Sequence, residues 1–100
     1  MILFYKSKGD NISKVDNKLK FPVSYEMRVI MDTVEDDNLN IDAIRAVLEE
    51  LRIPHRDWNH RRSSEAKYTS YSVKVMVRNH ETLKNLYAEL NKIPGVKHAI

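Results

Sequence analysis

The chain lacks cysteine altogether and has only two glycines, Gly9 and Gly95. The missing cysteine excludes disulfides, thiolate nucleophiles and cysteine-ligated zinc sites. Two isolated glycines exclude a glycine-rich phosphate loop or a dinucleotide fingerprint. No apolar run approaches the ~20 residues that span a bilayer, and the apolar start at residues 1–5 has no basic segment before it, unlike a signal peptide. We therefore expect a cytoplasmic protein that does not contact membranes.

The net charge of the chain is also small. Seventeen Lys and Arg against fourteen Asp and Glu give a net charge of +3, and 42% of the residues are hydrophobic. This composition is that of one ordinary globular domain. Residues 35–50 are mainly acidic and residues 52–67 mainly basic. Two solvated faces of opposite sign are the simplest interpretation of this separation.

The first twenty residues differ in composition from the rest of the chain. They contain lysines, asparagines and serines around a Gly9-Asp10-Asn11 turn signal, with few apolar residues to pack. Such a segment is typical of a flexible terminus. We expect residues 1–20 to form a lysine-rich tail and residues 21–100 to form a single domain.

The apolar residues of the domain recur with periods that predict secondary structure. Alternation over residues 23–33 predicts a strand with one buried face, and it returns over residues 68–78. Residues 55–62 predict a short strand anchored by Trp58, and residues 96–100 a final edge strand. Between them lie two helices, marked by apolar residues three and four positions apart. The two stripes are Ile41, Ile44, Leu48 and Leu51, and Leu83, Leu86, Tyr87 and Leu90.

The predicted helices have recognisable ends. Asn38 or Asn40 can cap the first helix and Asn79 the second, because each amide oxygen can accept a hydrogen bond from a free first-turn N–H. Pro54 and Pro94 end the two patterns. The order strand-helix-strand, strand-helix-strand then predicts an α+β, ferredoxin-like βαββαβ fold.

This fold would leave one side of the sheet uncovered. Right-handed crossovers place both helices on one face of a four-stranded antiparallel sheet. The expected register puts Arg28, Ile30, Lys74 and Met76 near the centre of the open face. Ile30 and Met76 are apolar where solvation alone would favour polar residues, and an apolar centre with a charged rim is how a modest interface is built. Scattered exposed apolar residues are the alternative interpretation.

A recognisable pattern runs through both halves of the domain, at residues 21–31, Ser63-Ser64, Tyr68, Ser70, residues 72–75 and, above all, residues 86–93. In these segments the chain resembles the YbeD-like family of small uncharacterised bacterial proteins. The resemblance covers residues 21–100 and implies a fold similar to that of amino-acid-sensing ACT regulatory domains. It brings no catalytic residues. Ala66 departs from the family pattern, which often has glycine in that loop.

A second candidate surface is basic. Its residues interleave with Trp58 and could hold phosphates while an aromatic ring stacks on a base. They are Arg56, Arg61, Arg62 and Lys67. This arrangement supports an alternative hypothesis of weak nucleic-acid binding, although Trp58 is more simply explained as a core residue.

The sequence contains no recognisable catalytic or metal-binding set. His55 and His60 are five positions apart, so a regular strand would place them on opposite faces, which argues against shared metal ligation. No acid, base and nucleophile combination emerges either. We therefore expect a protein without enzymatic activity, metal or cofactor. Its expected role is that of a regulatory or interaction module, which binds a partner protein, a second copy of itself or a small effector.

Overall fold

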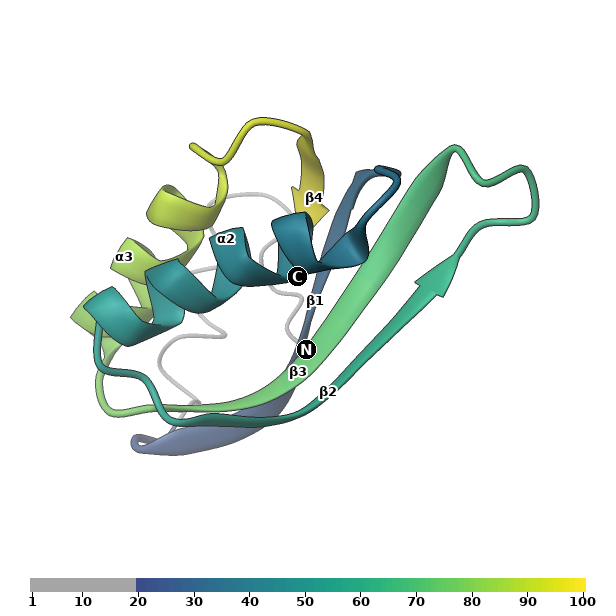
Figure 1. The fold of residues 1–100 in the computed structure, drawn as a ribbon. Coiled ribbons are helices and arrows are strands. Elements are labelled where there is room, and N and C mark those ends of the chain that lie inside the picture. The colour runs from purple at the N-terminus through teal and green to yellow at the C-terminus, as the bar shows by residue number, and fades with distance from the viewer. Residues whose placement is uncertain (1–19) are drawn as a thin grey trace, which may run out of the picture.

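The computed structural model describes residues 20–100, and its elements follow the predicted order (Figure 1). The predicted tail, apart from Lys20, lies outside the described residues. The elements are β1 (Val23–Asp32), α2 (Asp37–Glu50), β2 (His55–Arg62), β3 (Tyr68–Val77), α3 (His80–Leu90) and β4 (Val96–Ala99).

The four strands form one antiparallel sheet in the order β2-β3-β1-β4. Both helices lie on the same face of this sheet, and no helix of residues 20–100 covers the other face (Figure 1). The predicted α+β, ferredoxin-like βαββαβ fold is therefore confirmed. Within residues 20–100, neither helix is long and apolar enough to cross a membrane.

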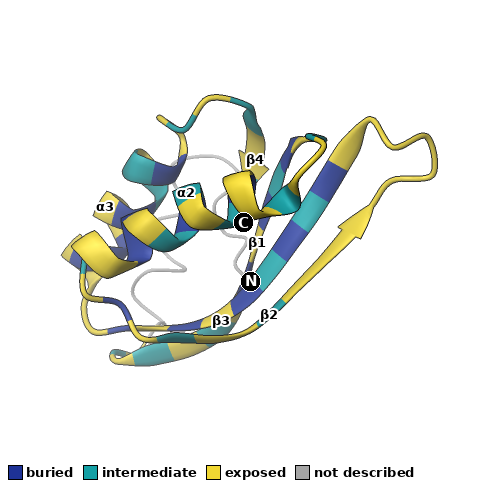
Figure 2. Ribbon diagram, in the orientation of Figure 1, coloured by how far each residue is buried: buried dark blue, intermediate teal, exposed yellow. Residues whose placement is uncertain are grey.

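The core lies between the sheet and the two helices (Figure 2). Val23 pairs with Val77, and the register continues unbroken to Asp32 opposite Tyr68. The odd-numbered residues of β1 and β3 therefore share one face of the sheet, and this face packs against the helices. The helices contribute their predicted stripes. Side chains buried to 1% exposure or less include Met27, Val29, Met31, Ile44, Leu48, Tyr71, Val73, Val77, Leu86 and Leu90. Each large apolar side chain buried in this way stabilises the fold by about 1.5–3 kcal/mol.

The cap of α2 differs from the prediction. Asp36, not Asn38 or Asn40, caps the helix, and its carboxylate accepts a 3.0 Å hydrogen bond from the backbone N–H of Asn38. Asn40 is buried inside the first turn, where its side-chain amide donates hydrogen bonds to the sheet. For α3 the predicted cap is confirmed, since Asn79 Oδ1 accepts a 2.8 Å hydrogen bond from the N–H of Thr82.

The expected placement of the two histidines is wrong, because β2 is not a regular strand. A bulge interrupts its pairing with β3 between Arg56 and Asn59, and Asp57 has a φ of 59° there. An extra residue in a strand reverses the side on which later residues point. His55 therefore lies opposite Val75 and His60 opposite Tyr71, both core-facing positions. Four residues of β3 separate these partners, roughly 13 Å, so the histidines still do not meet.

The β2–β3 hairpin extends beyond the helices at one end of the molecule (Figures 1 and 2). Every residue from 59 to 68 is exposed. The turn is held by Ser63, whose Oγ accepts 3.2 Å hydrogen bonds from the backbone N–H groups of Lys67 and Tyr68. Ala66 completes the turn with a φ of 55°, in the left-handed region.

Candidate functional site

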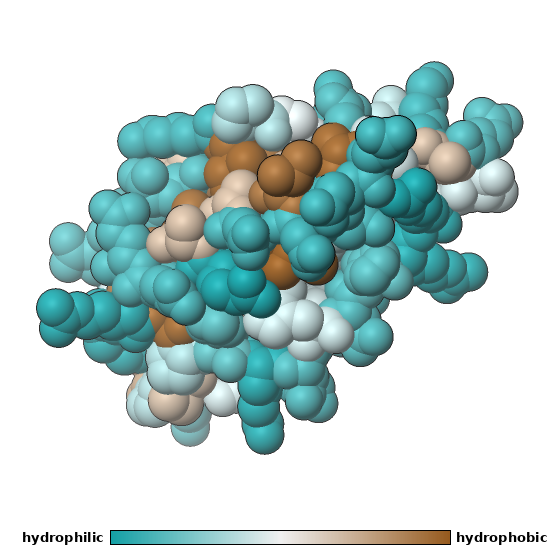
Figure 3. Space-filling view, viewed as in Figure 1, coloured by the Kyte–Doolittle hydropathy of each residue, from teal (hydrophilic) through white to brown (hydrophobic). Residues whose placement is uncertain are grey.

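The open face of the sheet carries the residues that the sequence singled out. Even-numbered positions of β1 and β3 point to this face, away from the helices. Met76 is 42% exposed and Tyr68 is 38% exposed, and they are two of the three large hydrophobic side chains exposed among the described residues. The third, Leu39, belongs to α2 on the opposite side. Figure 3 views that opposite, helix-covered side, which is mainly hydrophilic with hydrophobic side chains in small groups.

The four residues predicted for the face do not form one cluster. Met76 pairs with Ser24, whereas Ile30 pairs with Ser70 six residues farther along β1. Six residues of an extended strand span roughly 20 Å. Ile30 and Met76 therefore lie near opposite ends of the open face, with Arg28 between them along β1.

Two hollows occupy the two ends of this face. The first, of about 480 Å³, lies at the Met76 end and is lined in part by Glu26, Pro54, Arg56, Lys74 and Met76. The second, of about 430 Å³, lies at the hairpin end, and we call it the hairpin hollow. Its lining residues are Ile30, Arg61, Arg62, Ser63, Ser64, Tyr68 and Ser70.

The structure thus regroups the two predicted surfaces. Lys74 and Met76 of the open face come together with Arg56 of the basic set. Ile30 comes together with Arg61 and Arg62. Arg28 lines neither hollow and lies 3.9 Å from Glu26, measured between Nη2 and Oε1. Lys67 stands beside Tyr68, with its Nζ 6.0 Å from the ring centroid.

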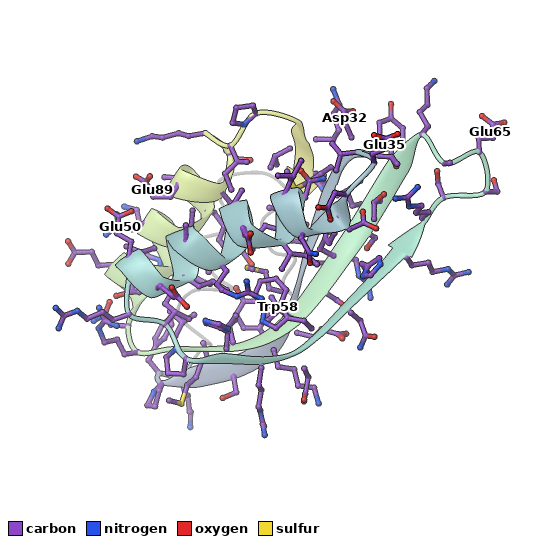
Figure 4. All side chains as sticks on the ribbon, viewed as in Figure 1. Asp32, Glu35, Glu50, Trp58, Glu65 and Glu89 are labelled. Atoms are coloured by element: carbon purple, nitrogen blue, oxygen red, sulfur yellow. The ribbon has the colours of Figure 1, made fainter. Side chains whose placement is uncertain are left out.

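The arginines of β2 do not share one face. Arg61 pairs with Ser70, an open-face position. The side chain of Arg62 turns toward the helix layer, where Nη2 donates to the backbone oxygen of Val34 at 3.0 Å and lies 3.3 Å from Asp37 Oδ2. Trp58 also points toward the helices and lies near α2 (Figure 4), with the guanidinium carbon of Arg45 5.3 Å from its ring centroid. This placement confirms the expectation that Trp58 anchors β2.

A polar cluster joins α2 to the helix side of the sheet. The hydroxyl of Tyr71 donates a 2.7 Å hydrogen bond to Asp37 Oδ1 and accepts one of 3.1 Å from the amide of Asn40. The same Asn40 amide donates to the backbone oxygen of Asp32 at 3.1 Å. His60 Nε2 lies 3.3 Å from Asp37 Oδ2. Asp37 thus faces a hydroxyl, an imidazole and the Arg62 guanidinium.

These contacts shift two pKa values. The hydrogen bond from Tyr71 lowers the pKa of Asp37 against the opposing effect of burial, and Arg62 and His60 lower it further. Burial raises the pKa of Tyr71, and the hydrogen bond to Asp37 adds to this increase. Perturbed pKa values can mark a functional site. Here Tyr71 is buried and its hydroxyl is engaged by Asp37 and Asn40, so the cluster holds the first turn of α2 on the sheet.

This cluster could hardly be predicted from sequence patterns. Asp37 reads as part of an acidic lead-in that favours the helix dipole, and Tyr71 reads as one more apolar position of a buried strand. The usable signal was the tyrosine hydroxyl, because a buried Tyr requires a hydrogen-bond partner. Among residues 20–100, no group of three or more His, Asp or Glu side chains is arranged to hold a metal ion.

Proteins of similar length match this chain in sequence. A UPF0250 protein of Shewanella piezotolerans is 30% identical over 88 residues, which cover 88% of this chain and 97% of the relative. A UPF0250 protein of Haemophilus influenzae is 28% identical over 94 residues, covering 91% and 96%. Both relatives are therefore matched over nearly their whole length, and the resemblance to the YbeD-like family is confirmed.

Solved structures share the architecture. Protein HP0495 from H. pylori superimposes with a TM-score of 0.65 at 20% identity, covering 83% of this chain and 86% of that protein. The ACT domain of GTP pyrophosphokinase from Chlorobium tepidum gives a TM-score of 0.59 at 15% identity, covering 78% and 83%. At these identities the likeness shows the fold alone. The model of the family DUF493, described as a protein of unknown function, matches residues 16–100, and the chain belongs to that family.

Proposed function

We propose that this protein is a small non-catalytic regulatory module that holds a partner protein against the open face of its sheet. The observation that carries the proposal is the placement of Met76 and Tyr68, large side chains exposed on the face that no helix of residues 20–100 covers. Charged side chains lie between these two ends of the face, among them Arg28 and Lys74. Large apolar side chains with charged neighbours are the usual build of a modest protein interface.

The kind of fold supports this role. The ACT domain of GTP pyrophosphokinase, which has the same architecture, is a domain of an enzyme and not the whole of one. A module of this kind needs a recognition surface and no reaction centre. The polar side chains around Asp37 hydrogen-bond to one another within the protein. We therefore place recognition on the open face and not at this cluster.

The alternative, nucleic-acid binding, has weaker support. A strand of nucleic acid needs a continuous basic groove with aromatic platforms. Arg61 and the Arg62 side chain point to opposite faces, and Arg56 lines the hollow at the other end of the sheet. Trp58 is engaged by His55 Nδ1, which accepts a 3.2 Å hydrogen bond from its Nε1, and by Arg45.

Partner capture with matched variants tests the proposal. Tagged wild-type protein and the variants Met76→Asp and Ile30→Asp are cross-linked in a bacterial lysate, and the captured proteins are identified by mass spectrometry. We expect a reproducible partner that both variants lose. Leu39→Asp is the control, because it adds the same charge at a side chain that is 64% exposed on the helix side. Circular dichroism verifies that each variant is folded.

Two results would contradict the proposal. One is a partner set that Met76→Asp and Ile30→Asp leave unchanged. The other is the loss of all partners in Leu39→Asp alone, which would move the interface to the helix side. RNA or DNA recovered in place of protein, with retention that falls steeply with salt, would favour the nucleic-acid alternative.

A further inference from the structure

The hairpin hollow differs from the rest of the open face in its charge. Elsewhere on this face, Arg28 and Lys74 each have an acidic neighbour. Arg28 lies 3.9 Å from Glu26, and Lys74 lies 3.8 Å from Asp57. The side chain of Arg61 has no hydrogen bond or ion pair with any of the described residues. No carboxylate of residues 20–100 lines the hollow, so the charge of Arg61 is uncompensated there.

Hydroxyl groups stand next to this arginine. Ser70 is the direct cross-strand neighbour of Arg61, and Ile30 is the next neighbour in the same row. Such neighbours have Cα atoms about 4.5–5.5 Å apart. Ser64 completes the rim from the turn. Arg61, Ser64 and Ser70 therefore offer a guanidinium fork and two hydroxyl donors to the same small volume.

Ser63 adds a third hydroxyl with a restricted role. Its Oγ already accepts two hydrogen bonds from the backbone N–H groups of Lys67 and Tyr68. A serine hydroxyl has one donor and two acceptor positions. With both acceptor positions occupied, Ser63 can only donate, so its hydroxyl suits an anion better than a cation.

We infer that the hairpin hollow binds a phosphate monoester whose carrier is apolar or aromatic. The inference rests on the proposed function, since it names the chemical group that would anchor a partner on the open face. The phosphate would accept hydrogen bonds from Arg61, Ser64 and Ser70. The carrier would pack on Ile30 and the Tyr68 ring, which form the apolar part of the lining.

Phosphate fits this lining better than a carboxylate does. A phosphate monoester has three strong acceptor oxygens and close to two negative charges at neutral pH, whereas a carboxylate has two oxygens and one charge. A guanidinium with three hydroxyls supplies enough donors for the larger anion. The hollow at the Met76 end does not qualify, because Glu26 lines it and would repel a phosphate.

Phenyl phosphate is the probe that tests the inference. It is titrated into the ¹⁵N-labelled protein, and amide shifts are followed by NMR. We expect shifts concentrated at Ile30, Arg61, Ser64, Tyr68 and Ser70. Arg61→Gln should weaken binding by about tenfold or more, since a hydrogen-bonded charge is removed. Arg56→Gln is the matched control, with the same change of charge on the same strand, and should leave the affinity within about twofold.

Titrations with further ligands identify the kind of molecule that carries the phosphate. Benzyl alcohol tests the ring without the anion, and inorganic phosphate tests the anion without the ring; both should bind more weakly than phenyl phosphate. A short phosphotyrosine peptide that binds more tightly than phenyl phosphate indicates a phosphorylated protein partner. Equal affinity for the two indicates that the phosphate group and its ring suffice, as expected for a small phosphorylated effector.

Several outcomes would overturn the inference. They are shifts spread evenly over the basic residues, equal losses in Arg61→Gln and Arg56→Gln, or no binding of phenyl phosphate at millimolar concentration. These results do not depend on partner capture. A protein partner that is lost with Met76→Asp but retained by Arg61→Gln would sustain the proposed function while rejecting the phosphate site.

Discussion

The hydroxyl of Tyr71 donates a 2.7 Å hydrogen bond to Oδ1 of Asp37, and this contact joins the middle of the sheet to the first residue of α2. The amide of Asn40 donates to the same hydroxyl from the same first turn of the helix. Removing the hydroxyl would leave the buried Asn40 without one of its acceptors. A lost partner for a buried polar group costs about 1–3 kcal/mol.

We accordingly expect Tyr71→Phe to lower the free energy of unfolding by about 1–3 kcal/mol in urea denaturation. Tyr68→Phe is the matched control, because that side chain is exposed and its hydroxyl has no partner among the described residues. The control should change stability by less than about 0.5 kcal/mol. Equal effects of the two substitutions would show that the cluster does not anchor α2.

The acid dependence of stability should depend on Asp37. Tyr71, Arg62 and His60 hold the pKa of this carboxyl below its ordinary value in the folded protein. A group with a lowered folded pKa stabilises the protein above its unfolded pKa, roughly 3.9, and loses that contribution as the pH falls through the folded pKa. Asp37→Asn should therefore be less stable at pH 7 and lose less stability than wild type between about pH 5 and pH 2.

Urea denaturation at stepped pH values measures this difference. Glu65→Gln is the control, because Glu65 is exposed at the hairpin tip (Figure 4) and has no partner among the described residues. Its acid profile should follow that of wild type. An Asp37→Asn profile parallel to wild type over the whole range would remove Asp37 from the account of acid stability.

The backbone conformation of Ala66 predicts that glycine at this position stabilises the protein. Its φ of 55° lies in the left-handed region, which costs a residue with a Cβ about 1–2 kcal/mol. Glycine avoids this cost but gives up about 0.4–1 kcal/mol through the entropy of the unfolded chain. Ala66→Gly should thus raise the free energy of unfolding by about 0.5–1 kcal/mol. Glu65→Gly, one position earlier without a positive φ, should give no gain; a gain there equal to that at Ala66 would exclude the backbone explanation.

The apolar stripe of α2 predicts that truncating one leucine lowers the stability strongly and that truncating another hardly changes it. Leu48 is 0% exposed in the core and Leu39 is 64% exposed on the same helix. Leu48→Ala should lower the free energy of unfolding by about 2–5 kcal/mol, through lost burial and the cavity left behind. Leu39→Ala should change it by less than about 0.5 kcal/mol. Comparable effects in thermal and urea denaturation would contradict the observed packing of α2.

Periodicity was sufficient to predict the fold because the core is built from regular elements. The alternation of Val73, Val75 and Val77 and the spacing of Ile44 and Leu48 each report one buried face. The same reasoning failed at His55 and His60. A bulge adds one residue to β2, and a strict alternation assigns every residue beyond it to the wrong face.

The candidate surface could be predicted only in part. Alternation along a strand assigns each residue to one face of the sheet, and it assigned both Ile30 and Met76 to the open face. Distance along that face depends on the register between strands, and the register brings Ile30 to Arg61 through Ser70. The hairpin hollow also needs the turn at Ser63, whose hydroxyl bonds no sequence pattern specifies.

The hairpin that projects past the helices has an evolutionary consequence. Its residues from 59 to 68 are all exposed, so most substitutions there change the folding free energy by only a few tenths of a kcal/mol. Selection can therefore alter the tip for recognition alone, while the valines and leucines of the core remain under selection for folding. In related chains, new partner preferences could arise at this tip without compensating changes elsewhere in the protein.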